Sequence, residues 1–123
     1  MIHPGDPQNE SDLRIAIVAA RFNASLTEML LKNTLAGLAT CNVTENQIEV
    51  FWVPGAFEIP VVAKHLGTGG LFDVVICLGV ILKGETDHDQ LVAHQSVRAL
   101  VDLSLSLNKP IGFGIIGDRK SVV

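Results

Sequence analysis

Four short segments of this 123-residue chain gather the residues that could do chemistry. The third segment holds Glu85, Thr86 and His88 directly after a long apolar run. Backbone amides left free ahead of a helix bind phosphate well, and a neighbouring imidazole can carry a proton in an elimination or an imine-forming condensation. The sequence therefore allows phosphate chemistry with proton transfer at this segment. The four segments are 21–23, 53–58, 81–88 and the stretch after Ile116.

Each residue of the third segment also has a plain structural interpretation. Thr86 can cap the helix that follows it, with Asp89 three residues on, and a cap needs no ligand. His88 falls in the first turn of that helix, where the positive helix end disfavours imidazolium and keeps the ring neutral. A neutral histidine can accept a proton, but a surface histidine in a first turn often has no role at all. Both interpretations stay open at this point.

The first two segments contain an aromatic ring and a carboxylate. Phe22 either packs at the edge of the core or offers its face to a flat ligand ring. Glu58 either caps nearby amides or accepts hydrogen bonds from sugar-like hydroxyls. Three other histidines have weaker claims because they lie in the amino-terminal arm or within helices: His3, His65 and His94.

Apolar runs and turn residues predict the elements that must position these segments. Strands are expected over 14–20, 47–53, 72–82 and 111–116, and helices over 25–40, 56–66 and from just after Thr86 to Leu107. Ser25 and Glu28 form the pattern of a capping box, and Pro60 is tolerated in a first helical turn. The alternation of strands and helices predicts a parallel sheet with helices on both faces. Ligands bind such sheets beyond the carboxyl ends of the strands, where the four segments fall.

The composition predicts that part of the surface is covered by copies of the same chain. Apolar residues make up 48% and charged residues 18%, although a small domain has much surface to keep wet. On the third helix one stripe would face the sheet, and Leu91 and Leu105 lie on the opposite side. These two leucines indicate a second packing surface or are simply scattered exposed residues. The stripe consists of Ala93, Val97, Leu100, Ser104 and Leu107, with Leu103 at its edge.

The charge balance argues against a general binder of nucleic acid or of anionic membranes. Basic residues number 9 and acidic residues 13, for a net charge of −4, whereas both kinds of binding rest on basic surface. The longest apolar run, 74–82, is far shorter than the about 20 residues that span a bilayer, and residues 1–13 lack a signal-peptide pattern. We expect a cytoplasmic protein with a loose arm over 1–12 and one domain over 13–123. Cys41 and Cys77 lack metal-ligand spacing and are interpreted as small core residues.

Three motifs in this order resemble the lumazine synthase family. They are Arg21-Phe22-Asn23, the run PGAFEIP from Pro54 to Pro60, and the run GVILKGETDH from Gly79 to His88, in which Lys83 stands where the family usually has Arg. The resemblance covers residues 13–116 and implies a flavodoxin-like three-layer α/β/α sandwich around a four-stranded parallel sheet. It also implies condensation of 5-amino-6-(D-ribitylamino)uracil with L-3,4-dihydroxy-2-butanone 4-phosphate to 6,7-dimethyl-8-ribityllumazine, phosphate and water. The family uses no metal and no organic cofactor for this reaction.

The resemblance implies a role for each matching residue. The phosphate of the butanone would contact Glu85 and Thr86, and His88 would transfer protons. Phe113 would serve the site of a neighbouring subunit. The ribitylaminouracil would be held by Phe22 stacked on its ring, by Ala56, Phe57 and Glu58 along its ribityl chain, and by backbone groups of Val80, Ile81 and Leu82 at its ring edge.

The family also has a characteristic assembly and a characteristic end of the chain. It forms pentamers, sometimes icosahedral shells of twelve pentamers, with active sites between subunits, so a homo-oligomer is expected, with riboflavin synthase as a downstream partner. After the fourth strand the family continues with a Thr-rich turn and further helices, one bearing an Arg that binds phosphate. Here Gly117 is followed by 118–123, and no residue matches that Arg. The C-terminal helices are therefore expected to be missing, through truncation, divergence or completion by another chain.

Two other functions remain open on the sequence. One is a shell- or ring-forming relative that binds ribityl-pyrimidines or flavins with little or no turnover. The other is a different small-molecule binder on a flavodoxin-like fold, which the pairing of Phe57 and Glu58 with the segment 85–88 disfavours.

Overall fold

The order of elements along the chain follows the alternation that the apolar runs predict. A computed structural model describes the backbone of residues 12–81 and 88–117, and the side chains of residues 12–80 and 94–115. The strands are β1 (Ile15–Ala20), β2 (Ile48–Val53), β3 (Val74–Ile81) and β4 (Ile111–Gly117). The helices are α1 (Ala24–Thr40), α2 (Ile59–Thr68) and α3 (His88–Leu107), with the short 3-10 turns η1 (Glu45–Gln47) and η2 (Ala56–Glu58).

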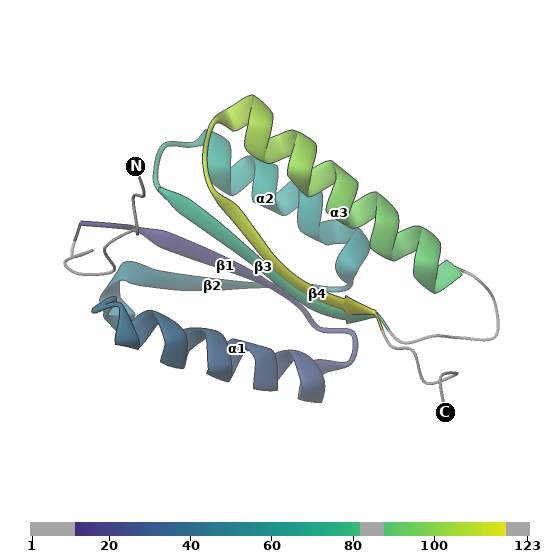
Figure 1. Ribbon diagram of the computed structural model, residues 1–123, viewed down its shortest axis with the longest axis horizontal. Helices are drawn as coiled ribbons and strands as arrows, with labels where there is room; N and C mark the ends of the chain where they lie inside the picture. Colours follow the sequence, from purple (N-terminus) through teal and green to yellow (C-terminus); the bar gives the residue numbers. More distant parts are fainter. Residues whose placement is uncertain (1–11, 82–87, 118–123) are drawn as a thin grey trace, which may run out of the picture.

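The strands form a parallel sheet in the order β2-β1-β3-β4. This is the order of the first four strands of a flavodoxin-like sheet. α1 covers one face of the sheet, and α2 and α3 lie together on the other (Figure 1). The predicted four-stranded, three-layer α/β/α sandwich is therefore confirmed.

The central strand β1 is apolar throughout because both of its faces are buried. Every residue of β1 is buried, and successive side chains point to opposite helical layers. Ala16, Val18 and Ala20 belong to the core under α2 and α3. Ile15 and Ile17 belong to the core under α1. A strand with two covered faces is fixed firmly, which gives the loops at its carboxyl end a rigid base.

The third helix packs on the sheet with the stripe that the sequence predicts. The members of this stripe whose side chains are described are buried or half-buried: Val97, Leu100, Leu103, Ser104 and Leu107. Leu105, predicted on the opposite side, is 76% exposed. Leu91 and Ala93 lie outside the described side chains. In the described part of the chain, no helix combines the length and the apolar character needed to cross a membrane.

One predicted helix start is wrong. Ser25 and Glu28 lie inside α1 and form no capping box, because the helix begins directly after Asn23. Asn23 is in the left-handed conformation with φ 64°, and its side chain does not cap the helix. The same capping pattern is present at Thr44 and Gln47, where both reciprocal hydrogen bonds form.

The second helix begins three residues after its predicted start. Residues 56–58 form η2, and α2 starts behind it with Pro60 in its first turn, as predicted. Proline is tolerated there because first-turn N–H groups have no partner within the helix. The short turn η2 therefore sits between the end of β2 and the start of α2, at the carboxyl edge of the sheet.

Candidate functional site

Backbone hydrogen bonds continue the pairing of β1 and β2 beyond the ends of both strands. The N–H of Arg21 donates to the carbonyl oxygen of Val53 at 2.7 Å. The N–H of Phe22 donates to the carbonyl oxygen of Pro54 at 3.0 Å. The segment after β1 thus lies directly against the turn that leads into η2. Two of the four segments that the sequence singles out meet at this edge of the sheet.

A side chain joins the same edge to β3. The Nδ2 group of Asn23 donates to the carbonyl oxygen of Val80 at 3.1 Å. Val80 is the second-last residue of β3, and its side chain is buried. The carboxyl ends of three neighbouring strands are therefore held together by direct hydrogen bonds.

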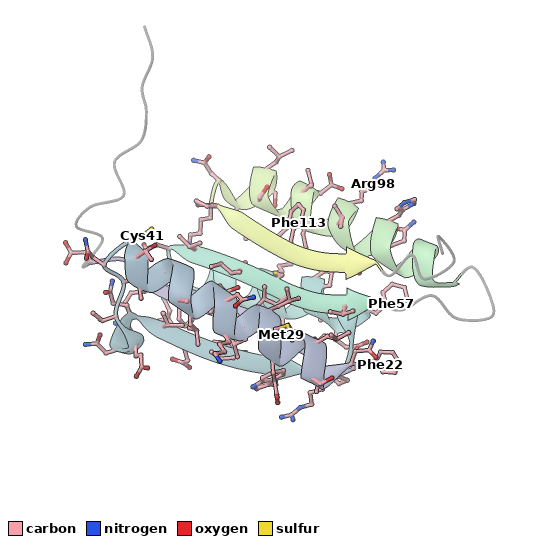
Figure 2. The ribbon with its side chains drawn as sticks, turned by 60° about the horizontal axis from the view of Figure 1, so that its bottom comes forward. Phe22, Met29, Cys41, Phe57, Arg98 and Phe113 are labelled. Carbon is pink, nitrogen blue, oxygen red and sulfur yellow. The ribbon has the colours of Figure 1, made fainter. Side chains whose placement is uncertain are left out.

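Two aromatic rings stand exposed at this edge. Phe22 is 66% exposed and Phe57 is 59% exposed, and Figure 2 shows both at the same end of the sheet. A ring of the core would be buried, so the interpretation of Phe22 as a core residue is wrong. Exposed aromatic faces at a fixed edge suit stacking on a flat ligand ring, and for Phe22 that role remains a prediction.

Glu58 places a carboxylate directly after Phe57, at the end of η2. It precedes α2, yet its side chain makes no capping hydrogen bond, so the interpretation as a helix cap is wrong. Its Oε1 atom lies 3.2 Å from the point where a Cβ atom on Gly55 would be. The glycine thus leaves room for the carboxylate to fold back over the turn. An exposed carboxylate has several free lone pairs and can accept hydrogen bonds from ligand hydroxyls.

A buried serine connects η2 to α3. The Oγ–H of Ser96 donates to the carbonyl oxygen of Ala56 at 3.3 Å, and both residues are buried. The serine lies in α3 eight residues after its first residue, His88. The helix that begins with His88 is thereby attached to the turn that carries Phe57 and Glu58.

The remaining predicted residues of this edge lie at or beyond the limits of the residues that the structure describes. Ile81 is the last residue of β3, and His88 is the first residue of α3, in the first helical turn as predicted. Their side chains lie outside the described ones. The predictions for Leu82, Glu85 and Thr86 fall wholly outside the described residues.

Comparison with known proteins identifies the family. The family model described as "6,7-dimethyl-8-ribityllumazine synthase" matches residues 12–121. The chain belongs to this family. A 6,7-dimethyl-8-ribityllumazine synthase of Protochlamydia amoebophila (strain UWE25) is 44% identical over 108 residues, which are 88% of this chain and 63% of the relative. The chain thus spans about 63% of the length of that curated relative.

One residue that the lumazine synthase resemblance assigns to the site lies apart from the others. Phe113 is in register with Cys77, three residues before Val80 on β3. At about 3.3 Å per residue it lies about 10 Å back along the sheet from the Val80 position. Its ring is 41% exposed on β4, an edge strand (Figure 2). The chain does not bring Phe113 together with Phe22 at the strand ends.

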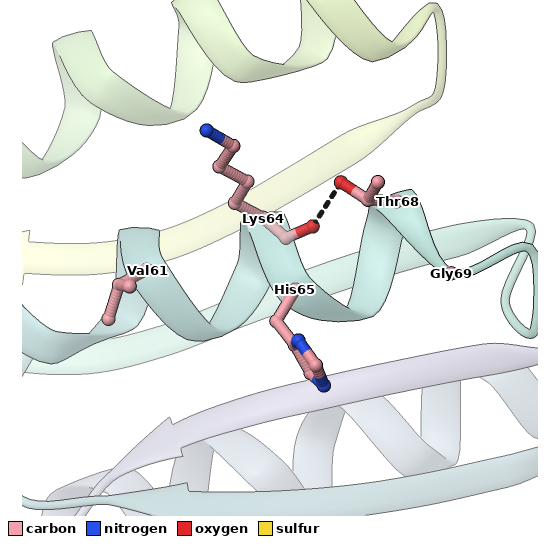
Figure 3. A pocket seen from close by; sticks show the side chains of 5 residues that line it. All are labelled: Val61, Lys64, His65, Thr68 and Gly69. Carbon is pink, nitrogen blue, oxygen red and sulfur yellow. Dashed lines mark hydrogen bonds between the residues drawn. The ribbon is translucent and has the colours of Figure 1, made fainter.

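This member of the lumazine synthase family also has a groove that does not belong to the candidate site. It is an open groove of about 480 Å³ along α2, lined by Val61, Lys64, His65, Thr68 and Gly69 (Figure 3). The Oγ1–H of Thr68 donates to the carbonyl oxygen of Lys64 at 2.6 Å, which is a bond within the helix. The groove runs toward the end of α2 opposite to Glu58. Within the described residues, no three His, Cys, Asp or Glu side chains gather as a metal-ligand set.

Both cysteines of this family member are small residues that pack in the core or against it. Cys77 is buried in the core under α2 and α3, where burial raises the pKa of its thiol to about 12. Cys41 is half-buried and packs against the core under α1. Cys77 thus confirms the prediction of a core residue, and Cys41 lies at the core's margin.

Three residues hold the edge together through contacts that the sequence did not predict. Asn23, Trp52 and Ser96 each contact a segment far away along the chain. Ser96 had a local signal, because it lies on the buried side of α3 between apolar positions. Asn23 had a weaker local signal, because asparagine tolerates a left-handed backbone better than most residues. Trp52 had none, since its contact depends on strand register.

Proposed function

We propose that the protein condenses 5-amino-6-(D-ribitylamino)uracil with L-3,4-dihydroxy-2-butanone 4-phosphate to 6,7-dimethyl-8-ribityllumazine in riboflavin biosynthesis. The observation that carries the proposal is the edge formed by Phe22, Phe57 and Glu58. Two exposed rings and an exposed carboxylate lie at strand ends that are hydrogen-bonded to one another. Membership in the lumazine synthase family supports the assignment of these two substrates to this edge.

The pyrimidine substrate needs one flat contact and several polar contacts. Phe22 stacks on its ring, because an exposed phenyl face on a fixed backbone suits a planar heterocycle. The carboxylate of Glu58 accepts hydrogen bonds from the ribityl hydroxyls, with Ala56 and Phe57 alongside. Backbone groups of Val80, Ile81 and Leu82 bind the ring edge. The Asn23 hydrogen bond to Val80 supports this by fixing the end of β3.

The second substrate brings a phosphate and a ketone. Its phosphate binds at Glu85 and Thr86, ahead of α3, where the positive helix end favours an anion. Imine formation between an amine and a ketone needs protons moved to and from the reacting groups, and His88 carries them. The start of α3 at His88 supports this assignment, because it places the histidine in the first helical turn, just after Glu85 and Thr86 in the sequence. No metal or organic cofactor takes part.

The same proposal extends to assembly and location. The protein forms a homo-oligomer, as a pentamer or a shell of pentamers, and works in the cytoplasm upstream of a riboflavin synthase. Leu105 supports the assembly, because a large apolar side chain that is 76% exposed gains from being covered. Phe113 on edge strand β4 then contributes to the site of a neighbouring subunit. The family match favours a synthase over a shell-forming relative without turnover.

Turnover by the purified protein tests the proposal. Both substrates are mixed with wild-type protein, and the absorbance of the lumazine product gives the initial rate. His88→Ala is expected to slow turnover without preventing binding of the ribityl substrate. His94→Ala is the matched control, because His94 is an exposed residue of the same helix. A rate equal to the uncatalysed one from folded wild-type protein would overturn the proposed function, and equal rates for the two variants would remove His88 from its role.

A further inference from the structure

A cation–π contact lies directly beside Phe22. The guanidinium carbon of Arg21 lies 5.8 Å from the centroid of the Trp52 ring. Arg21 is exposed and Trp52 is half-buried. Trp52 is also the single tryptophan of the chain. Neither residue has a role in the proposed chemistry.

Strand register explains why the two side chains meet. Trp52 is paired with Ala19, and Val53 is paired with Ala20, the last residue of β1. Arg21 is the next residue along the chain, and its N–H donates to the carbonyl oxygen of Val53 at 2.7 Å. Both the backbone and the side chain of Arg21 are therefore bound to the end of β2.

The side chain of Phe22 is exposed, while its backbone is held on both sides. Its ring is 66% exposed, so core packing does not hold it in place. Its N–H is bonded to Pro54, and the residue after it, Asn23, is held by its bond to Val80. The residue before it, Arg21, is in contact with the Trp52 ring. Phe22 thus sits between two residues that are each fixed to a neighbouring strand.

We propose that Arg21, stacked on Trp52, is a positioning residue that holds Phe22 in the orientation in which its ring stacks on the pyrimidine substrate. The proposal rests on the proposed function, which gives Phe22 its ligand. Fixing the ring before binding reduces the ordering that binding must otherwise impose. Cation–π contacts at exposed sites account for about two- to fivefold in an equilibrium constant, and this is the size of effect expected on substrate affinity.

Trp52 fluorescence tests the contact without any ligand. Arg21→Met keeps an unbranched side chain but removes the charge, and it is expected to change the tryptophan emission and increase its quenching by acrylamide. Arg98→Met is the control, because Arg98 is also exposed but lies on α3, away from β2 (Figure 2). Emission and quenching identical to wild type in Arg21→Met would overturn the contact.

Kinetics test the positioning role. Arg21→Met is expected to raise KM for the ribitylaminouracil by about two- to fivefold, with kcat and the KM for the butanone phosphate nearly unchanged. Trp52→Leu is expected to do the same, and Trp52→Tyr to restore most of the loss, because a phenol ring still offers a face to the cation. In a Phe22→Ala background, Arg21→Met is expected to have no further effect. The same rise in KM in that background would overturn the proposal.

Binding of the product separates this proposal from the proposed function. Wild-type protein is titrated with 6,7-dimethyl-8-ribityllumazine, and Trp52 emission is followed. Absence of both binding and turnover in wild type would overturn the proposed function, and the positioning role with it. Binding by wild type with an unchanged Kd in Arg21→Met would overturn the positioning role alone.

Discussion

The side chain of Asn23 donates a hydrogen bond to the carbonyl oxygen of Val80 at 3.1 Å across 57 residues of sequence. Asparagine that precedes a helix usually caps it, but here the amide reaches to a neighbouring strand instead. The bond ties the start of α1 to the end of β3 and places Phe22 between two fixed points. The geometry of the candidate site therefore depends on a contact between residues that are distant in sequence.

Asn23→Ala is expected to lower the free energy of unfolding by about 2 kcal/mol. About 1 kcal/mol comes from the lost hydrogen bond, and about 1 kcal/mol from the left-handed backbone that alanine adopts poorly. Denaturant titration measures the change. Asn42→Ala is the matched control, because Asn42 also has positive φ, at 66°, and no described side-chain hydrogen bond. A loss no larger than that of the control would show that the Val80 contact contributes nothing.

Gly55→Ala is expected to displace the carboxylate of Glu58. The new Cβ atom would lie 3.2 Å from Oε1, and a flexible side chain can move away at little cost. The free energy of unfolding should therefore change by less than about 0.5 kcal/mol, while KM for the ribitylaminouracil rises several-fold. Gly37→Ala, in α1 with open space around it, should instead stabilise the fold by about 0.5–1 kcal/mol. An unchanged KM in Gly55→Ala would argue against a role for the Glu58 position.

Lys109→Met is expected to loosen the end of α2. The Nζ group of Lys109 donates to the carbonyl oxygens of Gly67 at 2.7 Å and Phe72 at 3.1 Å. Removing charged hydrogen bonds from a half-buried position should lower the free energy of unfolding by about 1.5–3 kcal/mol. Lys32→Met, at an exposed position of α1, is the control and should change it by less than about 0.5 kcal/mol. Equal unfolding free energies for the two variants would contradict the account.

The two cysteines are expected to react very differently with a thiol reagent at pH 8. Burial raises the pKa of Cys77 from 9.0 to about 12, so its thiol stays protonated and enclosed, whereas half-buried Cys41 reacts. Between pH 9.0 and about 12 the unfolded state releases the Cys77 proton and the folded state keeps it. The contribution of Cys77 to the free energy of unfolding should therefore be fully present below pH 9. It should decrease as the pH rises above 9, by up to about 1.4 kcal/mol per pH unit.

Replacing Cys77 by valine isolates this effect. The Cys77→Val variant should lose this decrease in the free energy of unfolding above pH 9, and the Cys41→Ser variant should keep it. Rapid labelling of Cys77 in the native protein at pH 8 would contradict its place in the core.

The sequence predicted the architecture better than it predicted the site. Continuous apolar runs such as 74–82 mark buried strands, and Pro60 marks a first helical turn, because both depend on local chemistry. The capping box at Ser25 and Glu28 was wrong, because α1 begins directly after Asn23 and both residues lie inside the helix. The sequence allows two interpretations each for Phe22 and Glu58, since exposure depends on how distant segments pack. The Arg21–Trp52 contact depends on strand register, which no local pattern contains.

The most direct test of the central claim measures lumazine and inorganic phosphate in the same reaction. We expect folded protein to release one phosphate for each 6,7-dimethyl-8-ribityllumazine formed, only when both substrates are present, and faster than the uncatalysed condensation. No lumazine above the uncatalysed rate, from protein whose Trp52 emission shows that it is folded, would contradict the claim.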